Sequence, residues 1–129
     1  MDLPYSPDKP RKHEVIFSAE PVKKDTGVTA GDIAHRLLDY GMHAPTNYFP
    51  QIVHEALMIE PTESFDKSVL DNYAEAIKEI LEDAYKDASL IKSSPHRTSV
   101  GSVDEAKASR MSELALTWRM YQKNREQKD

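Results

Sequence analysis

The amino-acid sequence predicts an α+β protein: a small two-layer sandwich with a three- to four-stranded, mainly antiparallel sheet, two main helices on one face and a C-terminal helix. Three observations support this fold class. Short runs of β-branched and apolar residues alternate with two segments of helical periodicity. Capping residues precede helical segments, and prolines and glycines separate the segments. The resulting order is strand, helix, strand, strand, helix, loop, helix, which suits a sheet covered on one face by helices.

The chain has 129 residues, a length that suits one domain with its own core. Three prolines stand among charged residues in the first ten positions, and proline removes a backbone donor and restricts the residue before it. We therefore expect an extended segment there. The expected divisions are a proline-rich arm, an α+β domain, and a C-terminal helix with its tail, over residues 1–12, 13–100 and 101–129.

The first strand is predicted over His13–Ala19 (HEVIFSA), because β-branched and aromatic residues dominate this segment. Val15 and Phe17 stand two positions apart and would share one face of the strand. Downstream, the segment Lys23–Gly27 (KKDTG) has the composition of a turn.

The first helix is predicted within the segment TAGDIAHRLLDYG. Thr29 is a plausible N-cap, Asp32 follows three residues later, and Gly41 follows the last periodic residue as a stop signal. Apolar residues recur at helical spacing and form one face. They are Ala30, Ile33, Ala34, Leu37 and Leu38.

Two strands and the longest helix follow. Glu55–Pro61 (EALMIEP) is a short apolar run with the pattern of a buried strand, and Thr46–Phe49 (TNYF) is a possible shorter partner. From Asp66 to about Lys86, apolar residues repeat at helical spacing and charges fill the opposite face, which predicts an amphipathic helix. The apolar positions are Leu70, Tyr73, Ile77, Ile80, Leu81 and Ala84.

The last third is predicted to be a loop followed by a helix. Ser89–Ser102 has the serine, proline and glycine content of a surface loop. Ser102–Glu105 (SVDE) matches a capping box that would open the last helix. One side of that helix would carry an apolar stripe in need of a partner surface, made of Met111, Leu114, Ala115 and Trp118.

Composition narrows the class of function. With 17 basic and 22 acidic residues, the formal charge of −5 argues against binding driven by nucleic-acid phosphates. No apolar run approaches membrane-spanning length, so we expect no membrane insertion. The chain contains no cysteine, which excludes a disulfide framework and thiol chemistry. The first residues lack the apolar core of a secretory signal, and we expect a cytoplasmic protein.

Motifs that carry chemistry are sparse. Five histidines occur without the spacing of a metal site, four glycines are too scattered for a phosphate loop, and no Gly-x-Ser-x-Gly occurs. The segment RLLDYGMHAPTNYFP stands out, because Gly41 and two prolines would hold His43, Thr46 and Asn47 in a rigid connection. Polar groups held on such a connection suit a binding site, and the alternative is a stiff loop leading into an edge strand.

Four segments carry a resemblance to a known family. LPYSPDKPRKHEVIFSA, TGVTAGDIAHRLLDYGMHAPTNYFP, EALMIEPTES and SSPHRTSV, in this order, closely resemble the C-terminal region of the glycine-decarboxylating P-protein of the glycine cleavage system. The similarity is to the end of subunit 2 in the two-subunit form, and it covers nearly the whole chain.

The resemblance implies the small C-terminal domain of a pyridoxal-phosphate enzyme of fold type I. The whole enzyme would decarboxylate glycine and pass the aminomethyl group to the lipoyl arm of H-protein. In that family the Schiff-base lysine lies in a preceding large domain, and no Ser-x-His-Lys motif occurs here. The isolated chain would therefore hold no catalytic residue and be inactive. The implied partners are that large pyridoxal-phosphate-binding domain, subunit 1 and lipoylated H-protein.

The family motifs match ten positions: His43, Ala44, Pro45, Thr46, Glu60, Pro61, Thr62, Glu63, Pro95 and His96. The resemblance implies that the cofactor and substrate cleft is lined by His43, Thr46, Asn47 and His96, with Glu60 and Glu63 behind them. The alternative for each is a packing role. Many family members carry other residues after PTE, where this chain has Ser64, Phe65 and Asp66.

Two other classes of protein remain compatible with the residues alone. A small βαββα sheet covered by helices also suits a stand-alone module that binds a small ligand or dimerises. A structural assembly domain without any pocket contact is the third interpretation.

Overall fold

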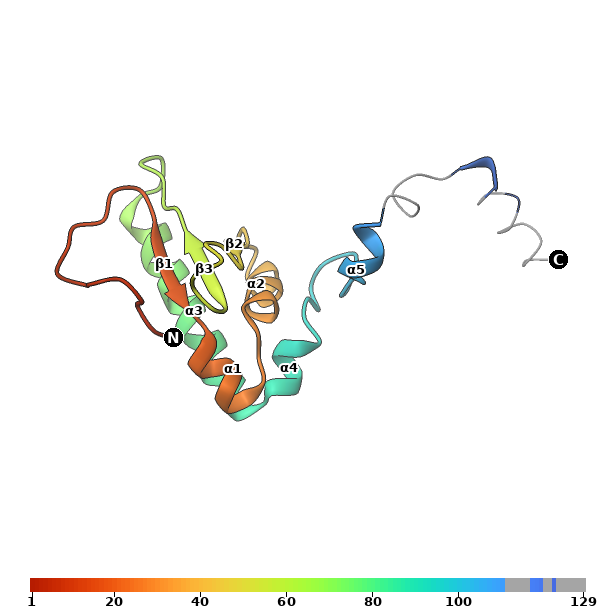
Figure 1. Ribbon diagram of the computed structural model, residues 1–129, viewed down its shortest axis with the longest axis horizontal. Helices are drawn as coiled ribbons and strands as arrows, with labels where there is room; N and C mark the ends of the chain where they lie inside the picture. Colours follow the sequence, from red (N-terminus) through yellow and green to blue (C-terminus); the bar gives the residue numbers. More distant parts are fainter. Residues whose placement is uncertain (111–116, 120–121, 123–129) are drawn as a thin grey trace.

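The computed structural model describes residues 1–110, 117–119 and 122. In these residues three strands and five helices follow one another (Figure 1). Their order is β1 (Val15–Ser18), α1 (Glu20–Thr26), α2 (Ala30–Asp39), β2 (Thr46–Asn47), β3 (Ala56–Ile59), α3 (Lys67–Lys86), α4 (Ala88–Lys92) and α5 (Glu105–Ala108). The small α+β sandwich predicted from the sequence is confirmed.

The sheet has the strand order β1-β3-β2, and both pairs are antiparallel. Phe17 and Asn47 are the register partners of Leu57 on either side. Leu57 is fully buried in the main core beneath the helices. Because neighbouring residues of a strand point to opposite faces, Ile16 and Met58 lie on the other face of the sheet.

The main core lies between the sheet and the helices, and α3 runs behind the strands in Figure 1. α3 packs against α1, α2 and α4, so it is the central helix of this layer. Its buried residues have the spacing expected for one face of an amphipathic helix. The buried members of the core are Ala19, Val22, Val28, Ala30, Ile33, Leu37, Leu57, Ala76, Ile77, Ile80, Ala84 and Ile91.

Both ends of α2 agree with the sequence prediction. The Thr29 hydroxyl accepts a hydrogen bond from the Asp32 amide at 3.2 Å, and the Asp32 carboxylate accepts one from the Thr29 amide at 2.8 Å. This reciprocal pair is a capping box. Gly41, just after the helix, has a φ of +70°, a left-handed conformation that glycine adopts without steric cost.

The predicted turn at Lys23–Gly27 is wrong, because most of it belongs to α1. Pro21 stands in the first turn of this helix, where its missing N–H is not needed. Val22 is buried in the main core and anchors the helix, and Gly27, with a φ of +75°, ends it. The residues whose composition suggested a turn form a short polar helix, and one buried side chain holds this helix in place.

The predicted loop from Ser89 to Ser102 is wrong at its start, where the chain forms α4. The Asp87 carboxylate accepts a hydrogen bond from the Ser89 amide at 3.0 Å and caps this helix. Ile91 is fully buried against the main core. Packing of Ile91 on the main core therefore stabilises a helix that the serine-rich composition of this segment does not predict.

The last helix begins later than predicted. Asp104, rather than Ser102, is the cap of α5, and its carboxylate accepts a hydrogen bond from the Lys107 amide at 2.9 Å. α5 ends at Ala108. Most of the predicted apolar stripe (Met111, Leu114 and Ala115) lies outside the described residues, and Trp118 is exposed.

The N-terminal segment is attached at its first residues. Asp2 and Ser18 exchange two backbone hydrogen bonds of 2.9 Å, and Met1 packs against the main core. Residues 3–14 form neither helix nor strand and arc away from the sheet before they enter β1 (Figure 1). Within the part of the chain that the structure describes, no helix is both long and apolar enough to cross a membrane.

Candidate functional site

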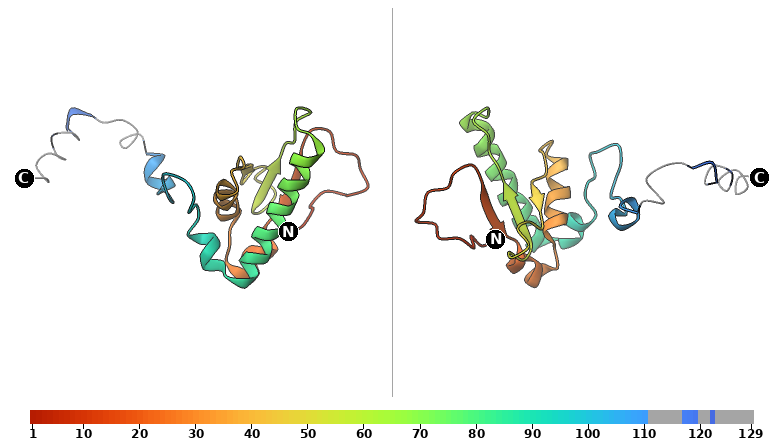
Figure 2. Two further views of the ribbon diagram at one scale, coloured as in Figure 1. Left: turned by 180° about the vertical axis from the view of Figure 1, so that it is seen from behind. Right: turned by 45° about the horizontal axis from the view of Figure 1, so that its top comes forward.

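The C-terminal end of α2 lies at the end of the sheet where most of the predicted site residues stand. Thr46 is the register partner of Met58 in an antiparallel pair, so β2 begins where β3 ends. Residues 41–45 connect the end of α2 directly to this point. The right-hand view of Figure 2 shows α2 rising alongside the strands towards that end.

Asp39 is the buried centre of this region. Its side chain is 2% exposed. The Oδ1 atom accepts hydrogen bonds from the backbone amides of His96, at 2.6 Å, and Arg97, at 2.7 Å. The Oδ2 atom accepts one from Nη1 of Arg36 at 2.9 Å. A single carboxylate thus attaches the segment that carries His96 to the last turn of α2.

The His96 ring is held on both nitrogens. Nη1 of Arg36 lies 3.3 Å from Nδ1, and the Ser93 hydroxyl lies 2.9 Å from Nε2. Oδ2 of Asp39 also lies 3.5 Å from Nδ1, so this nitrogen faces both a guanidinium donor and a carboxylate acceptor. The Ser93 hydroxyl in turn donates to the backbone oxygen of Ser89 at 2.8 Å. These contacts hold the ring in one orientation and leave 37% of the side chain exposed.

The electrostatics of Asp39 follow from these contacts. Burial raises the pKa of its carboxyl group, but the hydrogen bonds from the amides of Arg97 and His96 and from the Arg36 guanidinium outweigh burial and lower the pKa overall. Asp39 is therefore ionised at neutral pH. A carboxylate in the last helical turn is unfavourable for the helix dipole, and the three donors compensate for this.

Tyr40, which contacts Arg36, links the end of α2 to α3. The Arg36 guanidinium lies 5.6 Å from the centre of the Tyr40 ring, a distance that suits a cation–π contact. The Tyr40 hydroxyl donates to Oε2 of Glu79 on α3 at 3.1 Å. Burial, together with this hydrogen bond to a carboxylate, raises the pKa of Tyr40. The end of α2 is thus fixed to two neighbouring segments.

The opposite end of α2 is held by the connection between β2 and β3. Oε2 of Glu55 accepts a hydrogen bond from the Ala30 amide at 2.8 Å, and its Oε1 pairs with Lys23. The Tyr48 hydroxyl accepts one from the Gly31 amide at 3.2 Å. Glu55 and Tyr48 both have a positive φ, of +50° and +58°. Two backbone conformations that L-residues rarely adopt are stabilised by contacts with the helix.

The predicted site residues differ in how firmly they are held. His96 belongs to the Asp39 network described above. His43 and Thr46 are exposed, and Asn47 is half-buried in β2. Among the described residues, none forms a hydrogen bond or ion pair with the side chains of these three. Glu60 and Glu63 are exposed as well, and within the described residues neither contacts His96 or the other candidates through a hydrogen bond.

Sequence reasoning missed Asp39, Arg36 and Ser93. A signal for Asp39 was present, because an acidic residue in the last turn of a helix opposes the helix dipole unless a tertiary contact compensates it. Nothing in the sequence pattern indicated Glu55 or Tyr48 as partners of α2. In the described part of the chain, no group of three or more metal-binding side chains comes together.

Comparison with known proteins places the chain in a family. Residues 5–98 match the model of a family described as glycine dehydrogenase, C-terminal domain. This match covers well over half of the chain, so the chain belongs to that family. The resemblance noted from the sequence is confirmed.

Individual relatives identify the type of subunit. The chain is 60% identical, over 116 residues, to a probable glycine dehydrogenase (decarboxylating) subunit 2 of Pyrococcus furiosus. The equivalent proteins of Thermococcus onnurineus and Aeropyrum pernix are 59% identical over 116 residues and 50% identical over 118 residues. These alignments cover 90%, 90% and 92% of this chain and 23% of each relative. The chain thus spans about a quarter of the length of these relatives.

Proposed function

We propose that this chain serves as the C-terminal domain of subunit 2 in the P-protein of the glycine cleavage system. The whole enzyme would decarboxylate glycine with pyridoxal phosphate and transfer the aminomethyl group to the lipoyl arm of H-protein. The observation that carries the proposal is the 60% identity to a subunit 2 over 90% of this chain. Its expected location is the cytoplasm.

The described residues do not fit a covalently held pyridoxal phosphate. A Schiff-base lysine needs a desolvated environment that lowers its pKa, but every described lysine is exposed. The hydrogen bond to Glu55 shifts the pKa of Lys23 upwards, in the opposite direction. In the proposed enzyme the cofactor is therefore bound by the large domain of the same subunit, where it supplies an electron sink for decarboxylation.

The contribution of this chain would be one wall of the cleft. We assign this wall to the end of the sheet next to the C-terminus of α2, with His43, Thr46, Asn47 and His96 as its polar groups. His96 is the best-held member, because its ring is bonded on both nitrogens. Preorganised polar groups bind a substrate without the cost of ordering them. Subunit 1 and lipoylated H-protein would be the further partners.

Reconstitution tests the proposal. The chain is mixed with the remaining part of subunit 2, with subunit 1, pyridoxal phosphate and H-protein, and the exchange of label between bicarbonate and the glycine carboxyl group is measured. We expect exchange only when this chain is present. Equal exchange without it would contradict the proposal.

A further inference from the structure

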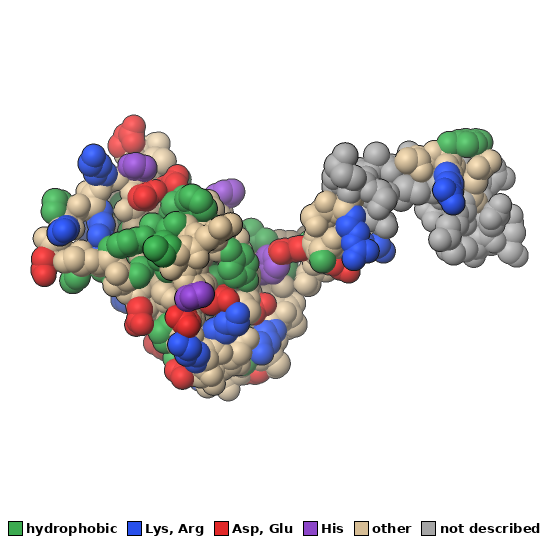
Figure 3. Space-filling view, in the orientation of Figure 1, with side chains coloured by type: hydrophobic (Ala, Val, Ile, Leu, Met, Phe, Trp, Pro, Cys, Tyr) green, Lys and Arg blue, Asp and Glu red, His purple; other side chains and the backbone are tan. Residues whose placement is uncertain are grey.

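The face of the sheet that points away from the helices is partly uncovered. Ile16 and Ala56, which are 9% and 0% exposed, lie on this face together with the half-buried Met58. The connection between β2 and β3 contributes Val53, which packs on them in a second, smaller cluster. Figure 3, in the orientation in which the strands lie in front of α3, shows hydrophobic side chains gathered over this region.

Large apolar side chains surround this face without being buried. Tyr5 of the N-terminal segment is 42% exposed, and Phe49 and Ile52 of the β2–β3 connection are 52% and 84% exposed. Single exposed apolar residues are ordinary, but a contiguous patch of them marks an interaction surface. The other face of the sheet is closed, because its Leu57 is fully buried beneath the helices.

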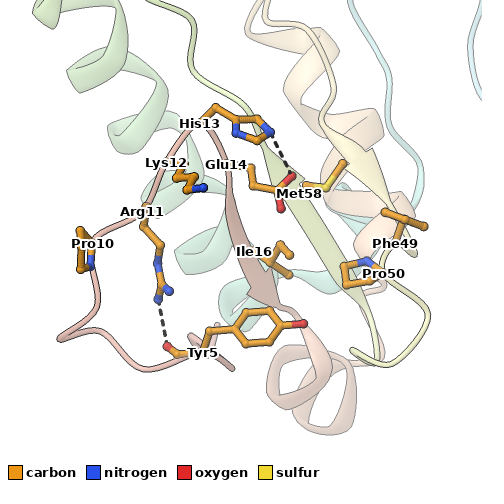
Figure 4. A pocket seen from close by; sticks show the side chains of 10 residues that line it. All are labelled: Tyr5, Pro10, Arg11, Lys12, His13, Glu14, Ile16, Phe49, Pro50 and Met58. Atoms are coloured by element: carbon orange, nitrogen blue, oxygen red, sulfur yellow. Dashed lines mark hydrogen bonds and ion pairs between the residues drawn. The ribbon is translucent and has the colours of Figure 1, made fainter.

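A pocket of about 370 Å³ opens between the N-terminal segment and the β2–β3 connection. Ile16 and Met58 form its floor, and Phe49 closes one side (Figure 4). Arg11 and Lys12 line the opposite side. We call this pocket and the apolar residues around it the open sheet face, defined by Tyr5, Ile16, Phe49, Ile52 and Met58.

The border of the open sheet face is basic. Arg11 donates to the backbone oxygen of Tyr5 at 2.9 Å, and neither Arg11 nor Lys12 forms an ion pair with a carboxylate of the described residues. Glu14 also lines the pocket, and its carboxylate lies 3.9 Å from Nε2 of His13. Two cationic groups thus remain available to a partner that offers carboxylates.

We infer that the open sheet face is the surface on which the remaining part of subunit 2 packs, through an apolar surface bordered by carboxylates. This inference rests on the proposed function. The relatives extend well beyond this chain, which spans 23% of their length, so most of each subunit is available as the occupant. Thr46 shares this face with Met58, so that the partner would also meet a predicted cleft residue.

A second exposed apolar group provides a matched control. Phe65, Val69 and Leu70, at the start of α3, are 52%, 44% and 39% exposed. None of them lines the pocket, and the lysine beside them, Lys67, is already paired with Asp71. If exposure alone caused association, aspartate at Val69 would disturb it as much as aspartate at Ile52.

The experiment measures binding of this chain to the remaining part of subunit 2 by isothermal titration calorimetry. We expect Ile52→Asp and Phe49→Asp to weaken binding at least tenfold and Val69→Asp to change it less than twofold. Arg11→Glu combined with Lys12→Glu should weaken binding most at low salt, because salt screens exposed charges. All variants should keep the wild-type melting temperature within a few degrees, since these side chains are exposed.

Three results would overturn the inference: no binding by the wild-type chain, unchanged binding by Ile52→Asp, or an equal loss with Val69→Asp. A further result would assign the face to a second copy of this chain and also overturn the inference. In that case the wild-type chain dimerises without binding the remaining subunit, and Ile52→Asp is monomeric. A different result would contradict the proposed function. A complex that forms through this face but shows no glycine–bicarbonate exchange would support the interface and contradict the activity.

Discussion

At the scale of single residues, Asp39 decides how the candidate site is built. One buried carboxylate accepts hydrogen bonds from two consecutive amides, those of His96 and Arg97, and from the Arg36 guanidinium. These donors come from α2 itself and from a segment nearly sixty residues later in the chain. Charge-assisted hydrogen bonds of this kind are stronger than neutral ones, so the position of His96 depends on this side chain.

Removing the Asp39 carboxylate should be costly. Asp39→Ala leaves two backbone amides and a largely buried guanidinium without their acceptor, and we expect the free energy of unfolding to fall by about 3 kcal/mol. Urea denaturation measures the change. Asp71→Ala serves as a control, because Asp71 forms an exposed pair with Lys67 and its loss should cost less than about 1 kcal/mol. Equal effects of the two substitutions would contradict the role of Asp39.

The same carboxylate predicts a pH dependence. The pKa of Asp39 is lowered in the folded state from an ordinary value of 3.8, so its stabilising contribution is complete above that value and is lost as the pH falls through the folded pKa. The stability difference between the wild-type chain and Asp39→Asn should be constant near neutral pH and shrink in acid. Urea midpoints over a pH series test this, and a difference that grows in acid would have the wrong sign.

His96 is expected to contribute to the activity of the reconstituted enzyme. His96→Ala should lower glycine–bicarbonate exchange at least tenfold, because a preorganised polar group is lost from the proposed cleft wall. His35→Ala is the matched control, since His35 is a part-exposed histidine of α2 whose ring contacts Glu105. Unchanged exchange in His96→Ala, with normal folding by circular dichroism, would leave His96 with a packing role.

His43 provides a comparison at the same end of the sheet. It is exposed and lacks the hydrogen bonds that hold His96. We expect His43→Ala to leave the stability of the isolated chain unchanged and to lower exchange in the reconstituted enzyme. Full exchange in His43→Ala would remove His43 from the proposed cleft.

At the scale of elements, α2 determines the geometry of the site because both of its ends are specified. The capping box at Thr29 and the carboxylate of Glu55 satisfy amides at its start. Gly41 reverses the chain at its end and leads directly to His43. Because both ends of α2 are defined, the connection to β2 starts from one position rather than from an ensemble of positions.

Substitutions at these ends should have separable costs. Gly41 has a positive φ, and no atom lies within 4 Å of the position that a Cβ would occupy. Gly41→Ala should therefore cost only the backbone strain, about 1 kcal/mol, and Gly41→Asn less, because asparagine tolerates this conformation better. Thermal denaturation compares the two variants. An equal or larger cost for asparagine would indicate a steric clash that the structure does not contain.

At the scale of the whole molecule, the fold is one-sided: helices seal one face of the sheet, and the other keeps a pocket and an apolar border. Such an arrangement suits a domain that completes a larger protein. The lysines agree with this interpretation. All of them are exposed within the described ranges, so none provides a desolvated amine that could bind a cofactor.

The isolated chain should therefore show no selective reaction with pyridoxal phosphate. After incubation with one equivalent and reduction with borohydride, peptide mapping should find label spread thinly over several lysines. Concentration of the label on one lysine would contradict this prediction and would indicate a cofactor site in this chain.

Much of the fold was predictable because its signals are local. The helical periodicity of Ile77 and Ile80, the capping pair of Thr29 and Asp32, and the glycine stop at Gly41 act within a few residues of one another. The main errors fell on α1 and α4, short polar helices that single buried residues such as Ile91 hold in place, and the start of α5 was placed too early. Short helices owe their stability to tertiary packing, which sequence periodicity does not report.

The α+β class, the long helix, the capped α2 and the family could all be read from the amino-acid sequence, because they depend on local periodicity, capping and motif order. The three-dimensional structure was needed to see that Asp39 holds the His96 segment and that Glu55 caps α2 from 25 residues away. It also shows which face of the sheet stays open. These features arise where segments distant in the chain meet. The free energy of burying and pairing their groups depends on both segments, so it cannot be predicted from either segment alone.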